Sequence, residues 1–215
     1  MSLTLHFHPL SSFCWKALIA LYENATPFES VLVDLQGHAE RAAFLKLWPI
    51  GKFPVLRDEA RDHMVPESSI IVEYLGRHYP GPVKLIPDDP DLSRQTRMCD
   101  RYFDLYLHMP MQKVVGDRLR PADKKDPFGV EQARAQMQMV LTMMEADLGP
   151  NWMMGDDFSL ADCGTAPALF YAAKLMQLGD KVSAYLGRLK ARPSFARVLK
   201  EAEPYFAMFP AEDRR

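Results

Sequence analysis

The first eighty residues alternate between strand-like and helix-like hydrophobic patterns. Residues 3–7 read Leu-Thr-Leu-His-Phe, in which every second side chain is apolar, as in a half-buried strand. Residues 15–23 follow without glycine or proline and carry the pattern of a helix. Similar patterns predict strands at 30–33, 53–56 and 63–65 and helices at 38–46 and 68–77. This order of strand, helix, strand, helix, hairpin and helix predicts a small mixed sheet flanked by helices.

Turn-forming residues separate this half of the chain from a second half of different character. Residues 80–90 read Pro-Gly-Pro-Val-Lys-Leu-Ile-Pro-Asp-Asp-Pro, which favours a linker over a regular element. Beyond it only helical periodicity recurs, over 92–108, 130–147, 160–178, 181–191 and 193–201. The sequence therefore predicts the α+β class. We expect a thioredoxin-like domain of βαβ-ββα order over 1–79, a linker over 80–90 and an all-helical bundle domain over 91–215.

One charged stretch interrupts the helical half. Residues 112–129 include Asp-Arg-Leu-Arg-Pro-Ala-Asp-Lys-Lys-Asp-Pro and show no sustained apolar face. A charge run of this kind is usually a solvated connection between elements, and this is the expected structure here. The alternative is a lid or a loop that contacts a partner.

Composition and net charge disfavour some functional classes but do not identify one. Of the 215 residues, 48% are hydrophobic and 25% charged, which is typical of a globular protein with a packed core. The formal net charge is −2, so the chain has no overall basic field and nucleic acid is not expected as a partner. Neither a signal-like amino terminus nor an apolar run long enough to span a bilayer is found. We therefore expect a cytoplasmic protein without membrane contact.

The cysteines indicate the redox compartment. The chain has three, Cys14, Cys99 and Cys163. Their odd number and wide spacing match neither a disulfide framework nor a CxxC or other metal-binding pattern. We therefore expect free thiols in a reducing compartment and no metal site.

The stretch that most clearly suggests a chemical function joins the first strand to the first helix. It reads His-Pro-Leu-Ser-Ser-Phe-Cys-Trp-Lys over residues 8–16, with two hydroxyls and one thiol at Ser11, Ser12 and Cys14. The unpaired N–H groups and the positive dipole end of a helix start stabilise an anion, including a thiolate. The alternative is structural: one serine caps the helix, and Cys14 is a small buried apolar residue.

Five short motifs occur along the chain in a defined order. They are Ser-Ser-Phe-Cys-Trp-Lys at 11–16, Pro-Ile-Gly-Lys-Phe-Pro-Val-Leu at 49–56, Glu-Ser-Ser-Ile-Ile-Val-Glu-Tyr-Leu at 67–75, Phe-Ser-Leu-Ala-Asp at 158–162 and Arg-Pro-Ser-Phe at 192–195. In this order and spacing the chain resembles the cytosolic glutathione transferase family, with a bacterial-type serine or cysteine loop. Each motif alone is weak, whereas five in the right order extend the resemblance over nearly the whole chain.

The resemblance implies a glutathione site in the first domain. In the family, the peptide bond equivalent to Phe53–Pro54 is cis. The main chain of Phe53 is then free to pair with the cysteinyl part of glutathione like an added strand. A plain edge-strand turn is the alternative. Glu67 and Ser68 would bind the ammonium and the carboxylate of the γ-glutamyl end at a helix start. Lys52 would face the glycine carboxylate.

Further polar residues are candidates for the same ligand. His38 and Gln36 lie where the family often supplies polar contacts to the glycine end. Asp100 would reach the γ-glutamyl ammonium in a neighbouring subunit, provided that the two-fold homodimer common in this fold forms. Surface pairing of Asp100 with Arg97 or Arg101 is the alternative.

The activity that the resemblance implies is that of a glutathione S-transferase, an enzyme of detoxification in which the glutathione thiolate attacks a small apolar electrophile. A thiol with a pKa of about 8.5 is mostly protonated at neutral pH, so the protein must favour the anion. A hydroxyl that donates to the sulfur at a helix start has this effect. Ser11 is the first candidate for this hydroxyl and Ser12 the second. Cys14 would instead form a mixed disulfide with glutathione, giving thiol transferase activity.

The electrophile is expected between the two domains, where Tyr106, Met109 and Phe206 would form a wall. Two other functions remain open. A glutathione-dependent isomerase or peroxidase acting on an anionic substrate would use Arg118 and Arg120, if their loop folds over the site. A non-catalytic ligand-binding or assembly module would keep the fold alone.

One motif is assigned to folding rather than to chemistry. Ser159 and Asp162 are three positions apart, ahead of an apolar helical pattern. This spacing matches the capping box, in which the serine and the acid each bond the other's main-chain N–H. We therefore expect Asp162 to fix a helix start.

Overall fold

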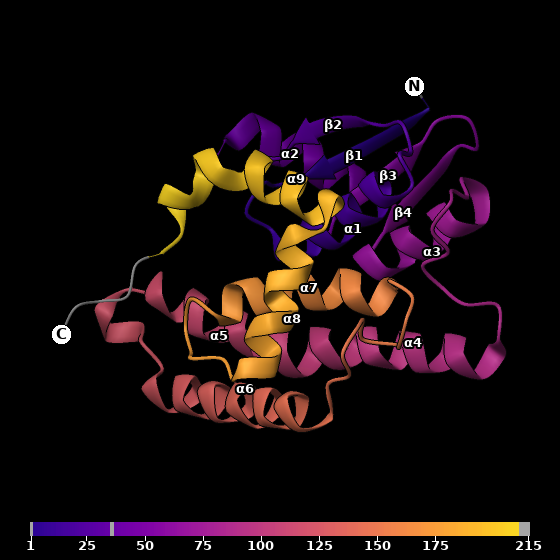
Figure 1. The fold of residues 1–215 in the computed structure, drawn as a ribbon. Coiled ribbons are helices and arrows are strands. Elements are labelled where there is room, and N and C mark those ends of the chain that lie inside the picture. Colours follow the sequence, from indigo (N-terminus) through magenta and orange to yellow (C-terminus); the bar gives the residue numbers. More distant parts are fainter. Residues whose placement is uncertain (1, 35–36, 211–215) are drawn as a thin grey trace.

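The computed structural model describes residues 2–34 and 37–210, in two parts that follow each other along the chain (Figure 1). The first part contains the strands β1 (Leu3–Phe7), β2 (Glu29–Leu32), β3 (Val55–Asp58) and β4 (His63–Pro66) and the helices α1 (Ser12–Glu23), α2 (His38–Leu47) and α3 (Ser68–His78). The second part contains α4 (Pro90–Phe103), a π-helical turn (Asp104–His108), α5 (Met109–Arg118), α6 (Pro127–Asp147), α7 (Leu160–Ala172), α8 (Asp180–Ala191) and α9 (Pro193–Ala202), with 3₁₀ turns at Ala122–Lys124 and Glu203–Met208. The predicted class, a thioredoxin-like part followed by a helical part, is confirmed.

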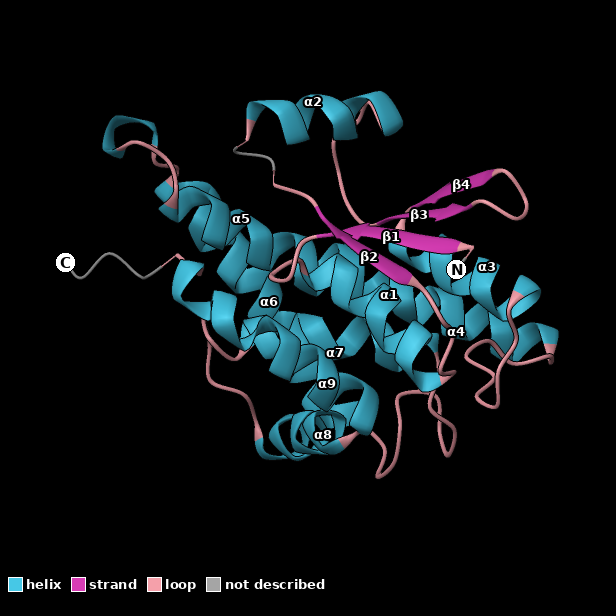
Figure 2. Ribbon diagram, turned by 90° about the horizontal axis from the view of Figure 1, so that it is seen from above, coloured by secondary structure: helices cyan, strands magenta, loops and turns pink. Residues whose placement is uncertain are grey.

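The four strands form one mixed sheet in the order β2-β1-β3-β4. β1 is parallel to β2, with Leu5 opposite Ser30, and antiparallel to β3, with Leu5 opposite Leu56. β3 and β4 form the predicted hairpin. Figure 2 shows α2 on one face of the sheet and α1 and α3 on the other. The alternating pattern of β1 therefore points Leu3 and Leu5, both buried, into the core.

Helix α1 lies at the centre of the molecule, between the sheet and the helical part. Its residues from Cys14 to Leu21 are all buried, and so are those of α7 from Leu160 to Leu169. A helix that is apolar on most of its circumference is buried on all sides, and these two helices pack on each other. Side chains of both parts thus belong to one hydrophobic cluster.

The expected solvated connection at 112–129 is wrong over its first third. Helix α5 continues to Arg118 and packs on α6, and its Val114 is 2% exposed. The face that α5 buries includes Pro110 and Asp117 beside its apolar residues. A stripe interrupted by such residues has no sustained apolar periodicity, so the sequence pattern did not reveal the helix.

Other element boundaries differ by a few residues. The helix predicted over 92–108 begins at Pro90 and leads through the π-helical turn into α5, and the helix predicted over 160–178 ends at Ala172. The strand predicted over 53–56 spans Val55–Asp58 instead, since Pro54 has no N–H to donate to the ladder.

The segment between α3 and α4 is bonded to both parts. The Asn24 side chain at the end of α1 bonds the main-chain N–H and C=O of Val83 at 2.8 and 3.0 Å. The carbonyl of Leu85 accepts a hydrogen bond from the Leu160 N–H at the start of α7, at 2.7 Å. The division into 1–79, 80–90 and 91–215 stays a prediction, which this order of elements supports. Within the described residues, no helix has both the length and the apolar character that crossing a bilayer requires.

Candidate active site at the start of helix α1

A cavity of about 390 Å³ lies between the loops of the sheet domain and the α4–α5 wall. Its lining comes from chain segments that are far apart in the sequence. These residues are Ser11, Phe13, Gly51, Lys52, Phe53, Pro54, Glu67, Ser68, Arg101, Asp104, Leu105, Met109 and Gln112. The fold thus brings the predicted loop, the cis-proline turn and the start of α3 to one place.

Ser11 both caps α1 and lines the cavity. Its Oγ accepts a hydrogen bond from the Cys14 N–H at 3.3 Å, and its backbone is extended, as in most N-cap residues. A hydroxyl that accepts through one lone pair still has its own proton to donate. Ser11 can therefore cap the helix and donate to an anion in the cavity at the same time.

The two other candidates of this loop point into the core. Ser12 is buried, and its Oγ forms a hydrogen bond with Nε2 of His108 on the π-helical turn. Cys14 is fully buried, its Sγ accepts from the His8 N–H at 3.5 Å, and burial raises the pKa of its thiol to about 12. A thiol that is neither ionised nor accessible does not enter disulfide exchange. The geometry argues against Ser12 and Cys14 as catalytic residues and favours the structural interpretation of Cys14.

The Phe53–Pro54 peptide is cis, as the resemblance implies. The ladder between β3 and β4 begins at Val55, opposite Pro66. The main chain of Phe53 therefore lies outside the ladder, at the edge of the cavity. Lys52 is exposed and lines the cavity next to it.

Glu67 has a left-handed backbone conformation, with φ 70° and ψ 120°. Residues other than glycine seldom adopt this region, and where the surrounding structure enforces it the position is often functional. The Glu67 carbonyl accepts the first helical hydrogen bond of α3, from the Ile71 N–H at 2.9 Å. Ser68 follows as the first residue of α3, so the unpaired N–H groups of a helix start lie at the cavity.

One face of α4, the π-helical turn and α5 forms the opposite wall of the cavity. Sequence analysis placed Met109 there but missed Arg101, Leu105 and Gln112. Positions 101, 105, 109 and 112 follow one another at spacings of four, four and three. Residues at such spacings share one helix face, and this periodicity is the sequence signal that would have identified them.

Two residues predicted for this wall lie elsewhere. Tyr106 packs beside Tyr102, with 5.4 Å between ring centroids, and is 47% exposed. Phe206 stacks on Phe170 of α7 at 5.6 Å. Neither lines this cavity, so the structure does not bring them together with the other site residues, and their role in a substrate pocket stays a prediction. Helical periodicity turns Tyr106 away from the face that carries Leu105 and Met109.

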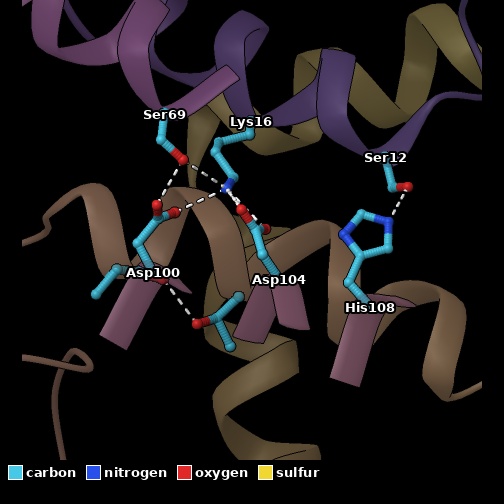
Figure 3. Close-up of polar contacts among 8 residues, drawn as sticks. Ser12, Lys16, Ser69, Asp100, Asp104 and His108 are labelled. Carbon is cyan, nitrogen blue, oxygen red and sulfur yellow. Dashed lines mark hydrogen bonds and ion pairs between the residues drawn. The ribbon is translucent and has the colours of Figure 1, made fainter. Parts of the chain in front are cut away.

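A buried charge cluster adjoins the wall, and its member Asp104 also lines the cavity (Figure 3). The Lys16 ammonium pairs with Asp100 at 2.8 Å and with both carboxylate oxygens of Asp104 at 2.7 and 2.6 Å. It also donates to the Ser69 hydroxyl at 3.2 Å, and that hydroxyl donates to Asp100 at 2.5 Å. The cluster joins α1, α3, α4 and the π-helical turn, so it holds the wall against the start of α1.

This cluster corrects the prediction for Asp100. The residue is 1% exposed, and its carboxylate pairs with Lys16 and accepts a hydrogen bond from Ser69, so it does not pair at the surface with Arg97 or Arg101. Arg97 instead bonds Glu73, at 2.8 and 2.9 Å. A β-carbon added at Gly164 of α7 would lie 2.7 Å from the Asp100 carboxylate, so the cluster needs glycine there.

His108 is also fully buried. Its ring stacks on Phe13, with 4.1 Å between centroids, and bonds Ser12. Burial, helped by the nearby Lys16 charge, lowers the pKa of His108 to about 3, so the ring is neutral at physiological pH. It belongs to a π-helical turn, a local departure from the α-helix that is frequent at functional sites.

The remaining candidates lie away from the cavity or outside the described residues. His38 is exposed at the first position of α2 and does not line the cavity, whereas Gln36 lies outside the described residues. Arg118 donates to the Pro210 carbonyl at 3.0 Å, and Arg120 pairs with Asp117 at 3.7 Å. Neither arginine reaches the cavity, so the structure does not support the role predicted for them with an anionic substrate.

The capping box at the start of α7 is confirmed. Asp162 accepts hydrogen bonds from the Ser159 N–H at 2.9 Å and the Ser159 hydroxyl at 3.0 Å, and both halves of the box are present. It accepts further bonds from the Met153 N–H at 2.8 Å and the Tyr185 hydroxyl at 2.5 Å. The residue is fully buried, as expected of a folding role.

A two-domain fold of this kind, with an anion-stabilising loop beside a cis-proline turn, is found in the glutathione transferases, and comparison with known proteins agrees. Residues 5–83 match the glutathione S-transferase N-terminal domain, and residues 127–201 match the glutathione S-transferase C-terminal domain. The chain belongs to the glutathione S-transferase family.

Three similar proteins illustrate the extent of the match. Glutathione S-transferase hmp2 of Hypomyces subiculosus is 29% identical, over 87% of this chain and 93% of its own. The structure of glutathione transferase URE2P8 from Phanerochaete chrysosporium, with oxidized glutathione, has a TM-score of 0.84 at 22% identity, over 96% of this chain and 97% of its own. A glutathione S-transferase from Methylobacillus flagellatus, solved with glutathione bound, has a TM-score of 0.81 at 25% identity, over 92% of this chain and 98% of its own.

Proposed function

We propose that this protein, as a glutathione S-transferase, binds reduced glutathione in the cavity at the start of α1. The Ser11 hydroxyl then stabilises the thiolate for attack on a small apolar electrophile. The observation that carries the proposal is that Ser11, Phe53 and the Glu67-Ser68 pair line one cavity although they lie far apart in the sequence. The bound glutathione in the related Methylobacillus flagellatus enzyme supports the choice of ligand.

The lining matches the three parts of glutathione. Glu67 supplies a carboxylate for the γ-glutamyl ammonium, and Ser68 at the start of α3 supplies donors for the γ-glutamyl carboxylate. The main chain of Phe53 pairs with the cysteinyl residue, and Lys52 faces the glycine carboxylate. A peptide held in this way presents its sulfur to Ser11.

The chemistry assigned to Ser11 is stabilisation of charge. Its O–H donates to the sulfur at the positive end of the α1 dipole, which favours the thiolate over the thiol. A hydrogen bond to a charged group contributes about 1.5–3 kcal/mol, which corresponds to a fall of about one to two units in the thiol pKa. The thiolate then forms a carbon–sulfur bond with the electrophile, and the leaving group departs with the electron pair.

The opposite wall suits an apolar second substrate. Leu105 and Met109 are 43% and 45% exposed and face the cavity. Apolar contact of this kind discriminates weakly among similar substrates, which fits a broad range of small electrophiles. Thiol transfer through Cys14 is disfavoured because its thiol is buried and protonated.

Replacing Ser11 by alanine tests the proposal. Calorimetric titration of the wild type with reduced glutathione near neutral pH is expected to show binding with proton release, and this release should diminish in Ser11→Ala. The value of kcat/KM with a chlorinated dinitrobenzene is expected to fall about 10- to 100-fold at neutral pH, since each pKa unit changes the thiolate fraction about tenfold.

Ser183→Ala, at an exposed position on α8, is the matched control and is expected to behave as the wild type. Absence of glutathione binding by the wild type at millimolar ligand would contradict the enzymatic function. Unchanged proton release in Ser11→Ala would remove Ser11 from the mechanism.

We also propose that the protein is a homodimer. Large apolar side chains are exposed on α4, the π-helical turn and α6, where Met98, Tyr106, Met139 and Met143 are between 47% and 64% exposed. A surface patch of this kind is typical of an interface.

Light scattering is expected to give twice the chain mass of 24.5 kDa for the wild type and the single mass for Met143→Glu. Met208→Glu, at a residue 58% exposed near the carboxyl end, should remain dimeric. A monomeric wild type would contradict this proposal.

A further inference from the structure

The loop that carries Ser11 has each of its main-chain carbonyls bonded to an identified donor. The His8 carbonyl accepts from the Ser11 N–H at 3.0 Å, and the Ser11 carbonyl accepts from the Trp15 N–H at 3.0 Å. The two carbonyls between them are bonded by side chains. The indole N–H of Trp15 donates to the Pro9 carbonyl at 2.6 Å, and the hydroxyl of Tyr171 on α7 donates to the Leu10 carbonyl at 2.7 Å.

Tyr171 is held rigidly by its neighbours. It is 2% exposed, and its ring stacks on those of Trp15 and Phe209, with centroid distances of 5.0 and 5.4 Å. The ammonium of Lys174 lies over Phe209 at 5.8 Å and over Phe206 at 5.2 Å. Burial raises the pKa of Tyr171, so its hydroxyl keeps the donating proton throughout the physiological range. The hydroxyl therefore has one fixed direction, toward Leu10.

We propose that Tyr171 and Trp15 are positioning residues for the glutathione S-transferase reaction, which fix the Pro9 and Leu10 carbonyls and thereby hold the Ser11 hydroxyl toward the sulfur. This inference rests on the thiolate site proposed above. Leu10 directly precedes Ser11, so a change in the Leu10 backbone displaces the Ser11 side chain. Neither Tyr171 nor Trp15 lines the cavity, and both act through the loop.

In this arrangement, aromatic residues near the carboxyl end stabilise the Ser11 loop although they do not line the cavity. Phe209 stacks on the Tyr171 ring, as Trp15 does. The aromatic residue Phe206, which sequence analysis placed against the electrophile, packs on the same cluster through Phe170. The segment that contains Phe206 and Phe209 thus packs on the aromatic residues that contact the Ser11 loop.

Tyr171→Phe tests the proposal, because it removes one hydrogen bond and keeps the stacked ring. The pKa of enzyme-bound glutathione, followed by thiolate absorbance, is expected to rise by about one unit, with about a tenfold fall in kcat/KM near pH 6.5. The fall should shrink as the pH approaches about 8.5, where a free thiol ionises without help. The affinity for the S-methyl derivative of glutathione, which has no ionisable thiol, should stay within about twofold, because its anchoring groups are untouched.

Tyr185→Phe is the matched control. Tyr185 is also a buried tyrosine that donates one hydrogen bond, to Asp162 at 2.5 Å, but it lies away from the loop. Its loss is expected to lower the melting temperature and to leave the thiol pKa unchanged. If Tyr171→Phe proves insoluble, Phe209→Ala removes one stacking partner of Tyr171 instead and should raise the thiol pKa in the same direction.

The outcomes separate this inference from the proposed function. If Ser11→Ala raises the thiol pKa and Tyr171→Phe does not, the thiolate site stands and the positioning role is wrong. A loss of kcat/KM in Tyr171→Phe that is equal at every pH, with an unchanged thiol pKa, also overturns the role. If the wild type does not ionise bound glutathione, the proposed function fails, and the positioning role fails with it.

Discussion

Lys16→Met is expected to lower the free energy of unfolding by about 3–5 kcal/mol, the usual cost of removing one partner from a buried ion pair. Methionine fills a similar volume but leaves Asp100 and Asp104 without their shared cation in the core. The Asp100 side chain is 2% exposed and that of Asp104, which also lines the cavity, is 10% exposed, so little water is available to replace the lost ammonium. Denaturant titration of the variant and the wild type at neutral pH measures the difference.

The deficit is expected to shrink as the pH falls. Burial raises the pKa of Asp104 and the Lys16 charge opposes the shift, so removing Lys16 raises this pKa further. A group whose folded-state pKa exceeds its unfolded value contributes stability below the unfolded pKa and loses it as the pH rises through the folded pKa. Lys16→Met should therefore be closer to the wild type at about pH 5 than at about pH 8.

An exposed ion pair between α4 and α3, next to the buried cluster, is the matched control. Arg97 of α4 bonds Glu73 of α3 at the surface, with side chains 44% and 33% exposed. Arg97→Met is expected to cost less than about 1 kcal/mol, because solvent screens such a pair. Equal losses for Lys16→Met and Arg97→Met would show that burial does not set the strength of the Lys16 cluster.

Asp162→Ala is the second change with a large expected effect, a loss of about 3–5 kcal/mol in the free energy of unfolding. The substitution leaves the buried Ser159 N–H, the buried Tyr185 hydroxyl and the partly buried Met153 N–H without their acceptor. Each unsatisfied buried group costs about 1–3 kcal/mol. Because α7 packs on α1, fraying of its first turn also exposes the shared core. Thermal and denaturant unfolding followed by circular dichroism measures the loss.

Asp89→Ala separates the effect of burial from that of capping alone. Asp89 caps α4 by accepting a hydrogen bond from the Leu92 N–H at 2.8 Å, but it is exposed. Its loss is expected to cost about 1 kcal/mol, as for an ordinary helix cap. A similar cost for Asp162→Ala would mean that the network around Asp162 adds nothing to its capping role.

Local sequence patterns were sufficient to predict most of the helices and strands and the residues on one side of the cavity. The alternation in β1 and the breaker residues before α4 depend only on neighbouring positions, so the βαβ-ββα order and the helical second half followed from them. The capping box at Ser159 is equally local, and the structure has it as predicted. Ser11, Lys52, Phe53 and the Glu67-Ser68 pair were named from motifs, and all line the one cavity.

Which residues lie on the other side of the cavity depends on how the helices pack and which of their faces point toward it. The cavity lining contains Met109 but not Tyr106, because the path of α4 through a π-helical turn determines which helix face points toward the Ser11 loop. Asp100 is a charged residue on a helix and was assigned to the surface or to a partner. Only the packing of α1 against α4 shows that Lys16 neutralises it in the core.

The sequence by itself determined most of the elements, the family and the residues on the sheet side of the cavity, since hydrophobic period, capping and turn chemistry act between near neighbours. The tertiary structure decided that Ser11 faces the cavity while Ser12 and Cys14 are buried, and that Tyr171 bonds the loop from 161 positions away. These outcomes depend on contacts between distant segments, whose geometry is set when the whole core packs at once. A local pattern carries no information on such contacts.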